Sequence, residues 1–303
     1  MGYLHKGLWA VVFAMVFANG SVCLSQTDKP STENLSMENP LVEVDQPGAS
    51  SRFQKVLIVV FENMGYQKVI ANPTMKKIAE MGATFTQSYA LGRPSQPNYI
   101  GMVAGSLLGT KTNDNYDLND NHVGDSLEAA GRTWRTYAED FPGNCFLGSQ
   151  AGNYVRKHNP FMSFKNVTGN AARCANVIND RGIVADLKAN QLADYNLWIP
   201  NLINDGHDGG LATLEPWAKN VLLPFLNLAA SNKELLVIVT FDEGSKFGTN
   251  QIYTAAIGAG IIPGTVVNRR TTHIDILGLV QKEFGLPRLP RQEVTNPAQG
   301  LWP

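Results

Sequence analysis

The sequence predicts an α/β domain with a mostly parallel sheet and helices on both faces of that sheet. Two continuous apolar runs, VLIVVF at 56–61 and LLVIVTF at 235–241, are typical of strands that are buried on both sides. Amphipathic helical patterns lie between the two runs, and this alternation favours a parallel sheet. Residues 53–303 show no composition break long enough for a linker, so we expect one domain there.

The elements between and after the two long strands follow from the same periodicities. Helices are predicted near 74–82, 98–107, 125–131, 181–192 and 214–230. Shorter strands are predicted at 133–138, 196–199 and 253–257. The last helix should begin at His273 and end near Gly285 and Pro287, which are helix stop signals.

The composition excludes several classes of protein. The chain has 303 residues, of which 44% are hydrophobic and 17% are charged, and a disordered chain would be far more polar. Lys and Arg number 25 against 26 Asp and Glu, which gives a net charge of −1. Such a chain has no overall basic field, so we expect no nucleic acid as a structural partner.

The N-terminus predicts export. Lys6 precedes an uninterrupted apolar run from Leu8 to Ala18, which is short for a bilayer span and typical of a signal peptide. We therefore expect a signal peptide over residues 1–25, with cleavage after Gly20 or Ser25; the alternative is an uncleaved membrane anchor. Residues 26–52 are polar and predict a disordered leader. The mature protein should then be secreted, extracellular or periplasmic, without a stable membrane span.

Two cysteines remain after the predicted cleavage, Cys145 and Cys174. In an exported protein two cysteines most simply form one disulfide, and the polar sequence around both favours this pairing. The alternative is a pair of buried free thiols. A bridge would hold both ends of the segment that carries His158.

Acidic and amide side chains follow the two long strands directly. Glu62 and Asn63 come after the first strand, and Asp242 and Glu243 come after the second. Ligands of open α/β sheets bind outside the carboxyl ends of the strands, where these side chains should gather. Adjacent carboxylates repel each other unless a cation or a proton lies between them. For Glu62 alone, the capping of the next helix is the simpler interpretation.

A serine is predicted just before a helix start, in the segment RPSQPNY at 93–99. The free N–H groups and the dipole of a helix N-terminus favour phosphate there and would lower the cost of an alkoxide on Ser95. The simpler alternative is a helix-capping serine followed by proline.

Histidines with acidic neighbours complete the candidate residues. His158 lies in KHNPF between the two cysteines, and Asp205 and His207 lie in the Gly-rich segment NDGHDGG. The second segment can place a carboxylate and an imidazole on one oxyanion or metal, although Asn, Asp and Gly also form plain surface turns. His273 starts the last helix, and His122 lies in the polar run NDNH, where we expect a solvated loop.

The order of these motifs resembles the phosphoesterase family that includes acid phosphatases and bacterial phospholipases C. The matching segments are FENMGY at 61–66, RPSQPNYIGMVAGS at 93–106, HNPF at 158–161, PNLINDGHD at 200–208 and FDEG at 241–244. The resemblance runs from about residue 55 to about residue 285. It implies a three-layer sandwich with a mostly parallel sheet, similar to alkaline phosphatase.

The resemblance also implies roles for individual residues. The implied metal ligands are Glu62, Asn63, Ser95, Asp242 and Glu243, and Ser95 is also the implied nucleophile. The groups implied to stabilise the phosphoryl oxygens or to protonate the leaving group are His158, Asp205 and His207. Two more residues are expected near the site with less defined roles, namely His273 and Arg93.

The predicted function is therefore a secreted, metal-dependent phosphoesterase that acts on a small phosphate ester. The family resemblance favours an acid phosphatase that hydrolyses phosphomonoesters through a phosphoserine. One divalent ion is expected, and ligands of this hard type suit Ca, Mg or Mn, with Zn as a further option. Two alternatives remain: a phosphodiesterase or phospholipase C on the same site, and a catalytically silent protein that binds metal or phosphate.

Overall fold

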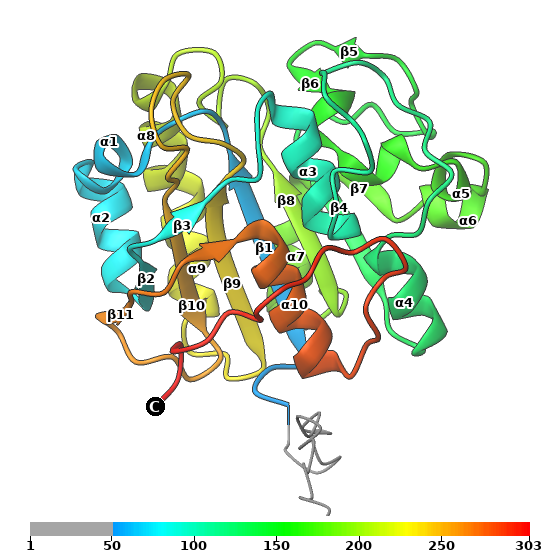
Figure 1. The fold of residues 1–303 in the computed structure, drawn as a ribbon. Coiled ribbons are helices and arrows are strands. Elements are labelled where there is room, and N and C mark those ends of the chain that lie inside the picture. The colour runs from blue at the N-terminus through cyan, green and yellow to red at the C-terminus, as the bar shows by residue number, and fades with distance from the viewer. Residues whose placement is uncertain (1–50) are drawn as a thin grey trace, which may run out of the picture. The chain divides into compact units, whose positions relative to one another are not determined.

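An eight-stranded mixed sheet forms the centre of the structure (Figure 1). The structure is a computed structural model that describes residues 51–303, so the predicted signal peptide and residues 26–50 of the leader lie outside the described residues. The strand order is β11-β2-β10-β9-β1-β8-β4-β7. The bounds are β1 Lys55–Phe61, β2 Ala83–Phe85, β4 Trp134–Ala138, β7 Val177–Asn179, β8 Tyr195–Ile199, β9 Leu235–Phe241, β10 Thr254–Gly258 and β11 Thr265–Val267.

The two long apolar runs are the neighbouring central strands β1 and β9. They pair in parallel, with Lys55 opposite Leu235 and Phe61 opposite Phe241, so both strands end at the same level of the sheet. β10 is antiparallel to β9 and to β2, whereas the other pairs in this sheet are parallel. The residues that follow Phe61 and Phe241 are thereby brought to one edge, as the sequence predicts.

Helices cover both faces of the sheet, which makes the predicted three-layer α/β sandwich (Figure 1). On one face, α3 (Ser95–Ala104) and α10 (His273–Phe284) pack on the side chains of Val56, Ile58 and Val60. On the other face, α2 (Pro73–Glu80), α8 (Leu211–Trp217) and α9 (Leu223–Ala229) pack on Leu57, Val59 and Phe61. The alternation of β1 side chains between two cores explains its unbroken apolar sequence.

The remaining elements are short. The helices are α1 Tyr66–Ile70, α4 Val123–Ala129, α5 Lys165–Thr168, α6 Ala171–Cys174 and α7 Ile183–Lys188. Single turns of helix lie at η1 Arg156–His158, η2 Pro160–Ser163 and η3 Asp180–Gly182. Two small strand pairs consist of β3 Ser88–Tyr89 with β12 Thr271–Thr272, and β5 Gln150–Ala151 with β6 Tyr154–Val155.

Two of the predicted helices differ in form. The helix expected over 214–230 is three segments, because a π-helix, η4 (Ala218–Leu222), separates α8 from α9. Pro224 has no N–H and its ring would clash with the carbonyl of Asn220, and a widened turn relieves this conflict. The helix expected over 181–192 is shorter, since α7 ends at Lys188 and Asn190 adopts a positive φ of 57°.

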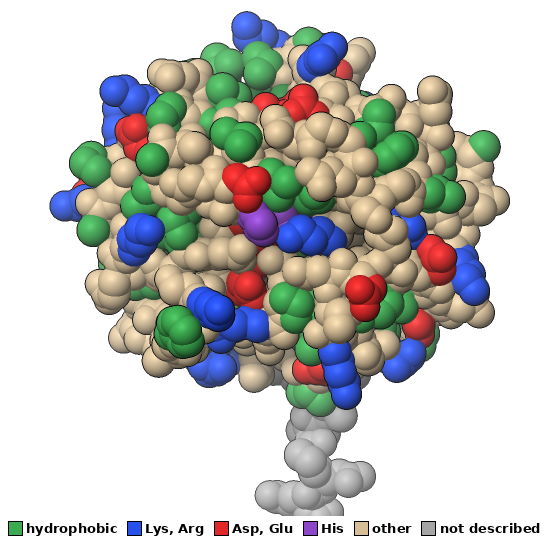
Figure 2. Space-filling view, turned by 90° about the horizontal axis from the view of Figure 1, so that it is seen from above, with side chains coloured by type: hydrophobic (Ala, Val, Ile, Leu, Met, Phe, Trp, Pro, Cys, Tyr) green, Lys and Arg blue, Asp and Glu red, His purple; other side chains and the backbone are tan. Residues whose placement is uncertain are grey.

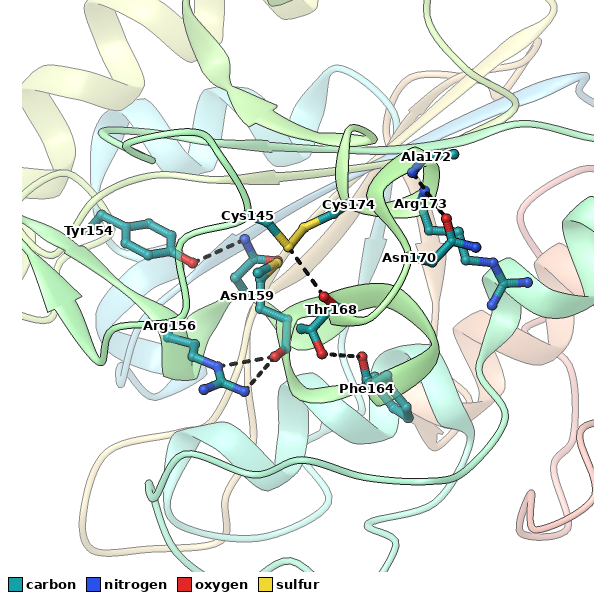
Figure 3. The surroundings of a disulfide bond; sticks show 11 residues. Cys145, Tyr154, Arg156, Asn159, Phe164, Thr168, Asn170, Ala172, Arg173 and Cys174 are labelled. Atoms are coloured by element: carbon teal, nitrogen blue, oxygen red, sulfur yellow. Dashed lines mark hydrogen bonds between the residues drawn. A yellow bond between two sulfur atoms is a disulfide. The ribbon is translucent and has the colours of Figure 1, made fainter.

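A disulfide joins Cys145 to Cys174, as predicted (Figure 3). The two Cα atoms are 5.6 Å apart, within the usual range for a disulfide. The closed loop contains Arg156, whose guanidinium donates to the carbonyl of Met162 at 2.8 and 3.1 Å, and Asn159, whose amide donates to the Tyr154 hydroxyl at 3.3 Å (Figure 3). Both interactions stiffen the segment on either side of His158.

The prediction of a solvated loop at His122 is wrong. His122 is fully buried and precedes α4, and its ring lies against Phe161 and Phe164. Its Nε2 is 3.1 Å from Oδ1 of Asn166. The prediction failed because the sequence neighbours of His122 are polar, which suggested an exposed loop although the His122 side chain is buried. Within residues 51–303, none of the helices has the length and apolar character needed to cross a bilayer.

Candidate active site

The candidate site lies at the carboxyl ends of β1 and β9. Glu62 and Asp242 directly follow these strands, and both side chains are fully buried. Backbone hydrogen bonds hold the two positions: the Asp242 N–H donates to the Phe61 carbonyl at 2.9 Å, and the Glu62 N–H donates to the Asp205 carbonyl at 2.9 Å. The sheet register therefore places carboxylates from three distant segments next to one another.

Asn63 connects the two strand ends to the serine. It adopts a positive φ of 51°, a conformation that Asn tolerates better than most side chains. Its N–H donates to Asp242 Oδ1 at 3.1 Å, and its own Oδ1 lies 3.4 Å from the hydroxyl of Ser95. The turn after β1 thus directs Asn63 toward the interior of the site.

Ser95 is the first residue of α3 and is buried. Its hydroxyl donates to Glu62 Oε2 at 2.9 Å. The turn before it is fixed by Asn98, whose Oδ1 accepts from the N–H groups of Leu91 and Gly92 and whose Nδ2 donates to the carbonyls of Gly92 and Pro94. The first turn of a ten-residue helix therefore points at the carboxylates, and its dipole favours negative charge there.

His158 lies between two of the buried carboxylates. Its Nε2 is 3.1 Å from Glu62 Oε1, and its Nδ1 is 3.2 Å from Asp205 Oδ2. Tyr99, one turn after Ser95 on α3, stacks on the imidazole with 5.1 Å between ring centroids and 14° between planes. The His158 ring consequently has a carboxylate oxygen near each nitrogen and the Tyr99 ring on one face, although Nε2 and Glu62 Oε1 form no hydrogen bond.

His207 is at the rim of the site, and its side chain is 30% exposed. Its N–H donates to Asp205 Oδ1 at 2.7 Å, and its Nδ1 lies 2.7 Å from Asp208 Oδ1. Its Nε2 is 3.2 Å from Nζ of Lys157. Figure 2 looks onto this face and shows a histidine at a hollow, between basic and acidic side chains.

The other three predicted residues border this group. Glu243 is buried, and burial raises its pKa to about 7, while the charges of Arg93 and Lys157 act in the opposite direction. Arg93 donates to the carbonyl of Ser245 at 2.6 Å, so it anchors the loop after β9. His273 is buried, and its Nε2 donates to the Asp242 carbonyl at 2.8 Å, which makes it a support for the end of β9.

The buried carboxylates shift one another's protonation. Burial raises the pKa of Glu62, and the charge of Asp205 raises it further. Burial also raises the pKa of Asp242, to which the charges of Glu62 and Glu243 add. Burial lowers the pKa of His158, with Lys157 and His207 adding to that effect. Such a cluster of like charges requires compensation by protons or by a cation.

The donor groups fit a divalent cation. Among the described residues, the buried oxygens Asp242 Oδ2 and Glu243 Oε2 have no hydrogen-bond partner, as expected of oxygens that bind a metal. Glu62, His158 and His207 also offer three ligand atoms within 4.8 Å of one another, so this trio could hold a metal ion. The second set contains two histidines that the family resemblance did not assign to the metal.

Sequence reasoning missed Tyr99, Asn98 and Lys157. Tyr99 and Asn98 are part of the segment RPSQPNY, and their spacing of four and three residues from Ser95 places them on the same helix turn as its side chain or next to it. Lys157 adjoins His158 in the sequence and was noted without a role. Helical spacing was the signal available for Tyr99; the sequence offered none for the contact between Lys157 and His207.

Comparison with known proteins assigns the family. Residues 37–287 match the Phosphoesterase family. The chain belongs to this family. A probable acid phosphatase of Kluyveromyces lactis is 31% identical over 275 residues, covering 86% of this chain and 65% of that protein. An acid phosphatase of Aspergillus fumigatus is 31% identical over 253 residues, covering 79% and 56%. This phosphoesterase thus spans less than two thirds of either fungal protein.

A bacterial relative matches over more of its length. A phosphatidylinositol-3-phosphatase of Mycobacterium tuberculosis is 32% identical over 256 residues, which cover 82% of this phosphoesterase and 83% of that protein. Among solved structures, a protein of the alkaline phosphatase superfamily from Vibrio parahaemolyticus has a TM-score of 0.55 at 14% identity, covering 79% of this chain and 68% of that one. A putative sulfatase from Bacteroides thetaiotaomicron has a TM-score of 0.53 at 12% identity, covering 80% and 73%. These likenesses confirm the predicted fold.

Proposed function

We propose that this phosphoesterase is an acid phosphatase that hydrolyses phosphomonoesters through a phosphoserine on Ser95. The observation that carries the proposal is the contact of 2.9 Å between the Ser95 hydroxyl and Glu62 Oε2 at the N-terminus of α3. A hydroxyl in this position has an acceptor for its proton and a helix dipole that favours the phosphoryl charge. The acid phosphatases and the phosphatidylinositol phosphatase among the relatives support the same reaction class.

In the first half-reaction, Ser95 Oγ attacks the phosphorus atom in line with the leaving oxygen. A P–O bond forms to Ser95 as the P–O bond to the alcohol breaks. The Oγ proton moves to an acceptor, for which Glu62 Oε2 is in place. His158 and His207 are the candidates to protonate the leaving alcohol, because Asp205 faces the imidazole of His158 and Asp208 faces that of His207, which orients both rings.

In the second half-reaction, water attacks the phosphoserine from the side that the alcohol has left. The P–O bond to Ser95 breaks, Glu62 returns the proton to Ser95 Oγ, and inorganic phosphate is released. The histidine that protonated the alcohol now accepts the proton of the attacking water, since the same group serves both steps. Tyr99 stacks on His158 and thereby preserves the geometry of that ring through the cycle.

We infer that the site works with one divalent ion. The ligands proposed for it are Glu62, Asn63, Ser95, Asp242 and Glu243. Oxygen ligands of this kind suit Ca, Mg or Mn, whereas participation of His158 and His207 would favour Zn. When bound, such an ion neutralises charge on the phosphoryl oxygens and favours the ionised form of the serine hydroxyl.

We also propose that the protein is secreted. The basis is the apolar run from Leu8 to Ala18 behind Lys6, followed by small residues. The disulfide between Cys145 and Cys174 supports an oxidising compartment. Expression with the native N-terminus, followed by N-terminal sequencing of protein from the medium or the periplasm, tests the proposal. Ser21 or Gln26 is expected as the first residue, and retention of Met1 on a cytoplasmic protein would contradict it.

An assay of the chelated protein tests the function. Metals are added back one at a time between pH 4 and 9, with a phosphomonoester (p-nitrophenyl phosphate), its bis-aryl diester and a phosphatidylinositol phosphate as substrates. We expect turnover of monoesters with a divalent ion and no comparable turnover of the diester. Ser95→Ala should abolish it, whereas Ser126→Ala on α4 should not. Faster diester turnover would favour the phosphodiesterase alternative, and metal binding without turnover would favour the silent protein.

A further inference from the structure

The structure assigns a substrate-binding role to Lys157: we propose that its ammonium group donates hydrogen bonds to a non-bridging oxygen of the phosphoryl group. This inference rests on the proposed function, because it concerns the same site. It extends the set of residues that bind the substrate by one that neither the motif pattern nor the proposed mechanism uses.

The backbone at Lys157 is held on both sides. Arg156 is buried and donates to the carbonyls of Leu147, Tyr116 and Met162, which tie η1 to two loop segments and to η2. On the other side, His158 is fixed by Glu62, Asp205 and Tyr99. Because both neighbours of Lys157 are held in place, the direction of its Cα–Cβ bond is fixed. The side chain of Lys157 therefore reaches the site from a defined position.

The side chain is also oriented at its far end. A carboxylate only accepts hydrogen bonds, so the 2.7 Å contact with Asp208 Oδ1 places the proton of His207 on Nδ1. His207 Nε2 is then an acceptor, and the Lys157 ammonium donates to it at 3.2 Å. An ammonium group has three N–H donors, and in the described part of the chain no carboxylate lies within ion-pair distance of Nζ. Donors therefore remain for a ligand.

The charge of Lys157 acts on the whole site. It opposes the increase in pKa of Glu62, of Asp205 and of Glu243, which come from three different segments. A lysine that is near all three, without being paired to one of them, is positioned for an anion that enters between them. Arg93, the other cation near Glu243, already donates to the Ser245 carbonyl.

A series of contacts leads from the nucleophile to Lys157. The Ser95 hydroxyl is 2.9 Å from Glu62, a Glu62 oxygen and a His207 nitrogen lie within 4.8 Å of each other, and His207 Nε2 is 3.2 Å from Lys157 Nζ. The nucleophile and the ammonium are thus separated by two side chains that also line the site. Lys157 thus lies one side chain away from the Glu62–His158–His207 group, and His207 Nε2 orients its ammonium there, which is the basis for proposing that it binds an oxygen of a phosphoryl group on Ser95.

The test compares Lys157→Met, which keeps the length of the side chain, with Lys157→Arg, which keeps the charge. Lys165→Met, at the exposed start of α5, is the matched control. For each variant, calorimetry measures the Kd of the metal-loaded protein for inorganic phosphate, and steady-state kinetics on p-nitrophenyl phosphate give kcat, KM and the Ki of phosphate. Thermal unfolding of each variant checks that the fold is intact.

We expect Lys157→Met to raise the Kd and Ki of phosphate about 10- to 100-fold and to lower kcat/KM by a similar factor, since a charge-assisted hydrogen bond is lost. Lys157→Arg should restore most of the binding, and Lys165→Met should match the wild type. The proposal is overturned if Lys157→Met binds phosphate like the wild type, or if Lys157→Arg binds it no better than Lys157→Met. If the wild type hydrolyses no ester, the proposed function fails, and the Kd for phosphate still decides the role of Lys157.

Discussion

The imidazole of His158 lies between Glu62 and Asp205, two carboxylates that are far apart in the sequence. One ring nitrogen lies 3.1 Å from Glu62 and the other lies 3.2 Å from Asp205. Glu62 in turn accepts the hydrogen bond of Ser95 at 2.9 Å. A continuous series of polar contacts therefore connects Asp205 to the proposed nucleophile. A substitution of Asp205 should consequently change the rate of the reaction.

Asp205→Asn tests this path. The substitution keeps the shape of the side chain and removes the charge that faces His158. We expect kcat to fall about 100-fold with little change in KM, because the proton-transfer group is misoriented while the phosphate site remains. Asp120→Asn, which disturbs an ion pair with Arg291 at the surface, should leave kcat unchanged. An unchanged kcat in Asp205→Asn would remove Asp205 from the mechanism.

Without a metal, the four buried carboxylates of the site should lower the stability of the folded protein. They are Glu62, Asp205, Asp242 and Glu243. Burial raises the pKa of Asp242, and the charges of Glu62 and Glu243 raise it further, so ionising Asp242 without a cation costs stability. Asp242→Asn should therefore stabilise the chelated protein, by about 0.5–2 kcal/mol, while it abolishes activity. The gain should grow as the pH rises above about 3.8, because the carboxyl then ionises in the unfolded wild type but keeps its proton in the folded state, which lowers the stability of the wild type.

Thermal unfolding with and without chelator measures this effect. Saturating metal should raise the melting temperature of the wild type and raise that of Asp242→Asn much less, because a ligand stabilises only the state that binds it. Lower stability of chelated Asp242→Asn than of chelated wild type would contradict the interpretation of these carboxylates as a cation site.

His122 should make the fold sensitive to acid. Burial lowers its pKa from 6.5 to about 4, an effect that Asp125 partly opposes. The folded state therefore excludes a proton that the unfolded state binds. The stability is fully present above about pH 6.5 and is lost as the pH falls toward 4, by about 3 kcal/mol in total.

Urea unfolding at pH 7 and pH 4.5 measures the contribution of His122. His122→Gln keeps an amide that can reach Asn166 and cannot take up a proton in this range. The decrease in unfolding free energy between the two pH values should be smaller in this variant than in the wild type. Equal decreases would show that His122 is not the group responsible.

The disulfide should contribute to stability through the length of the loop that it closes. Cys145 and Cys174 are 29 positions apart, so removing the bridge should cost about 3–4 kcal/mol. The double variant Cys145→Ala, Cys174→Ala should show this loss in urea unfolding. Reduction of the wild type should have the same effect, and a loss well below 1 kcal/mol would mean that the loop is held by its other contacts.

The centre of the fold was predictable because its signals are local. The apolar runs at 56–61 and 235–241 are within one residue of β1 and β9, since strands buried on both faces need unbroken apolar sequence. The three-residue strands β2, β7 and β11 were missed because such short segments have no measurable period. The antiparallel direction of β10 could not be predicted either, because the pattern of hydrophobic residues does not depend on strand direction.

The site residues were predictable where a reactive or charged side chain lies at the end of a strand or at the start of a helix. The acids after β1 and β9 and the serine at the start of α3 have this property, and the structure places them together. Tyr99 was missed because an aromatic residue on an apolar helix suggests only core packing. His122 was misjudged and Lys157 was missed for one reason: a charged or polar sequence neighbourhood does not reveal which side chains of a loop contact the rest of the protein.

The most direct test of the account is the capture of the phosphoserine. Metal-loaded wild type is mixed with a phosphomonoester, quenched in acid during turnover and digested, and the peptides are mapped by mass spectrometry. The account predicts one phosphoryl group on the peptide that contains Ser95, at that residue, and none in Ser95→Ala. Full turnover by Ser95→Ala, or a phosphoryl group on a different residue, would contradict it.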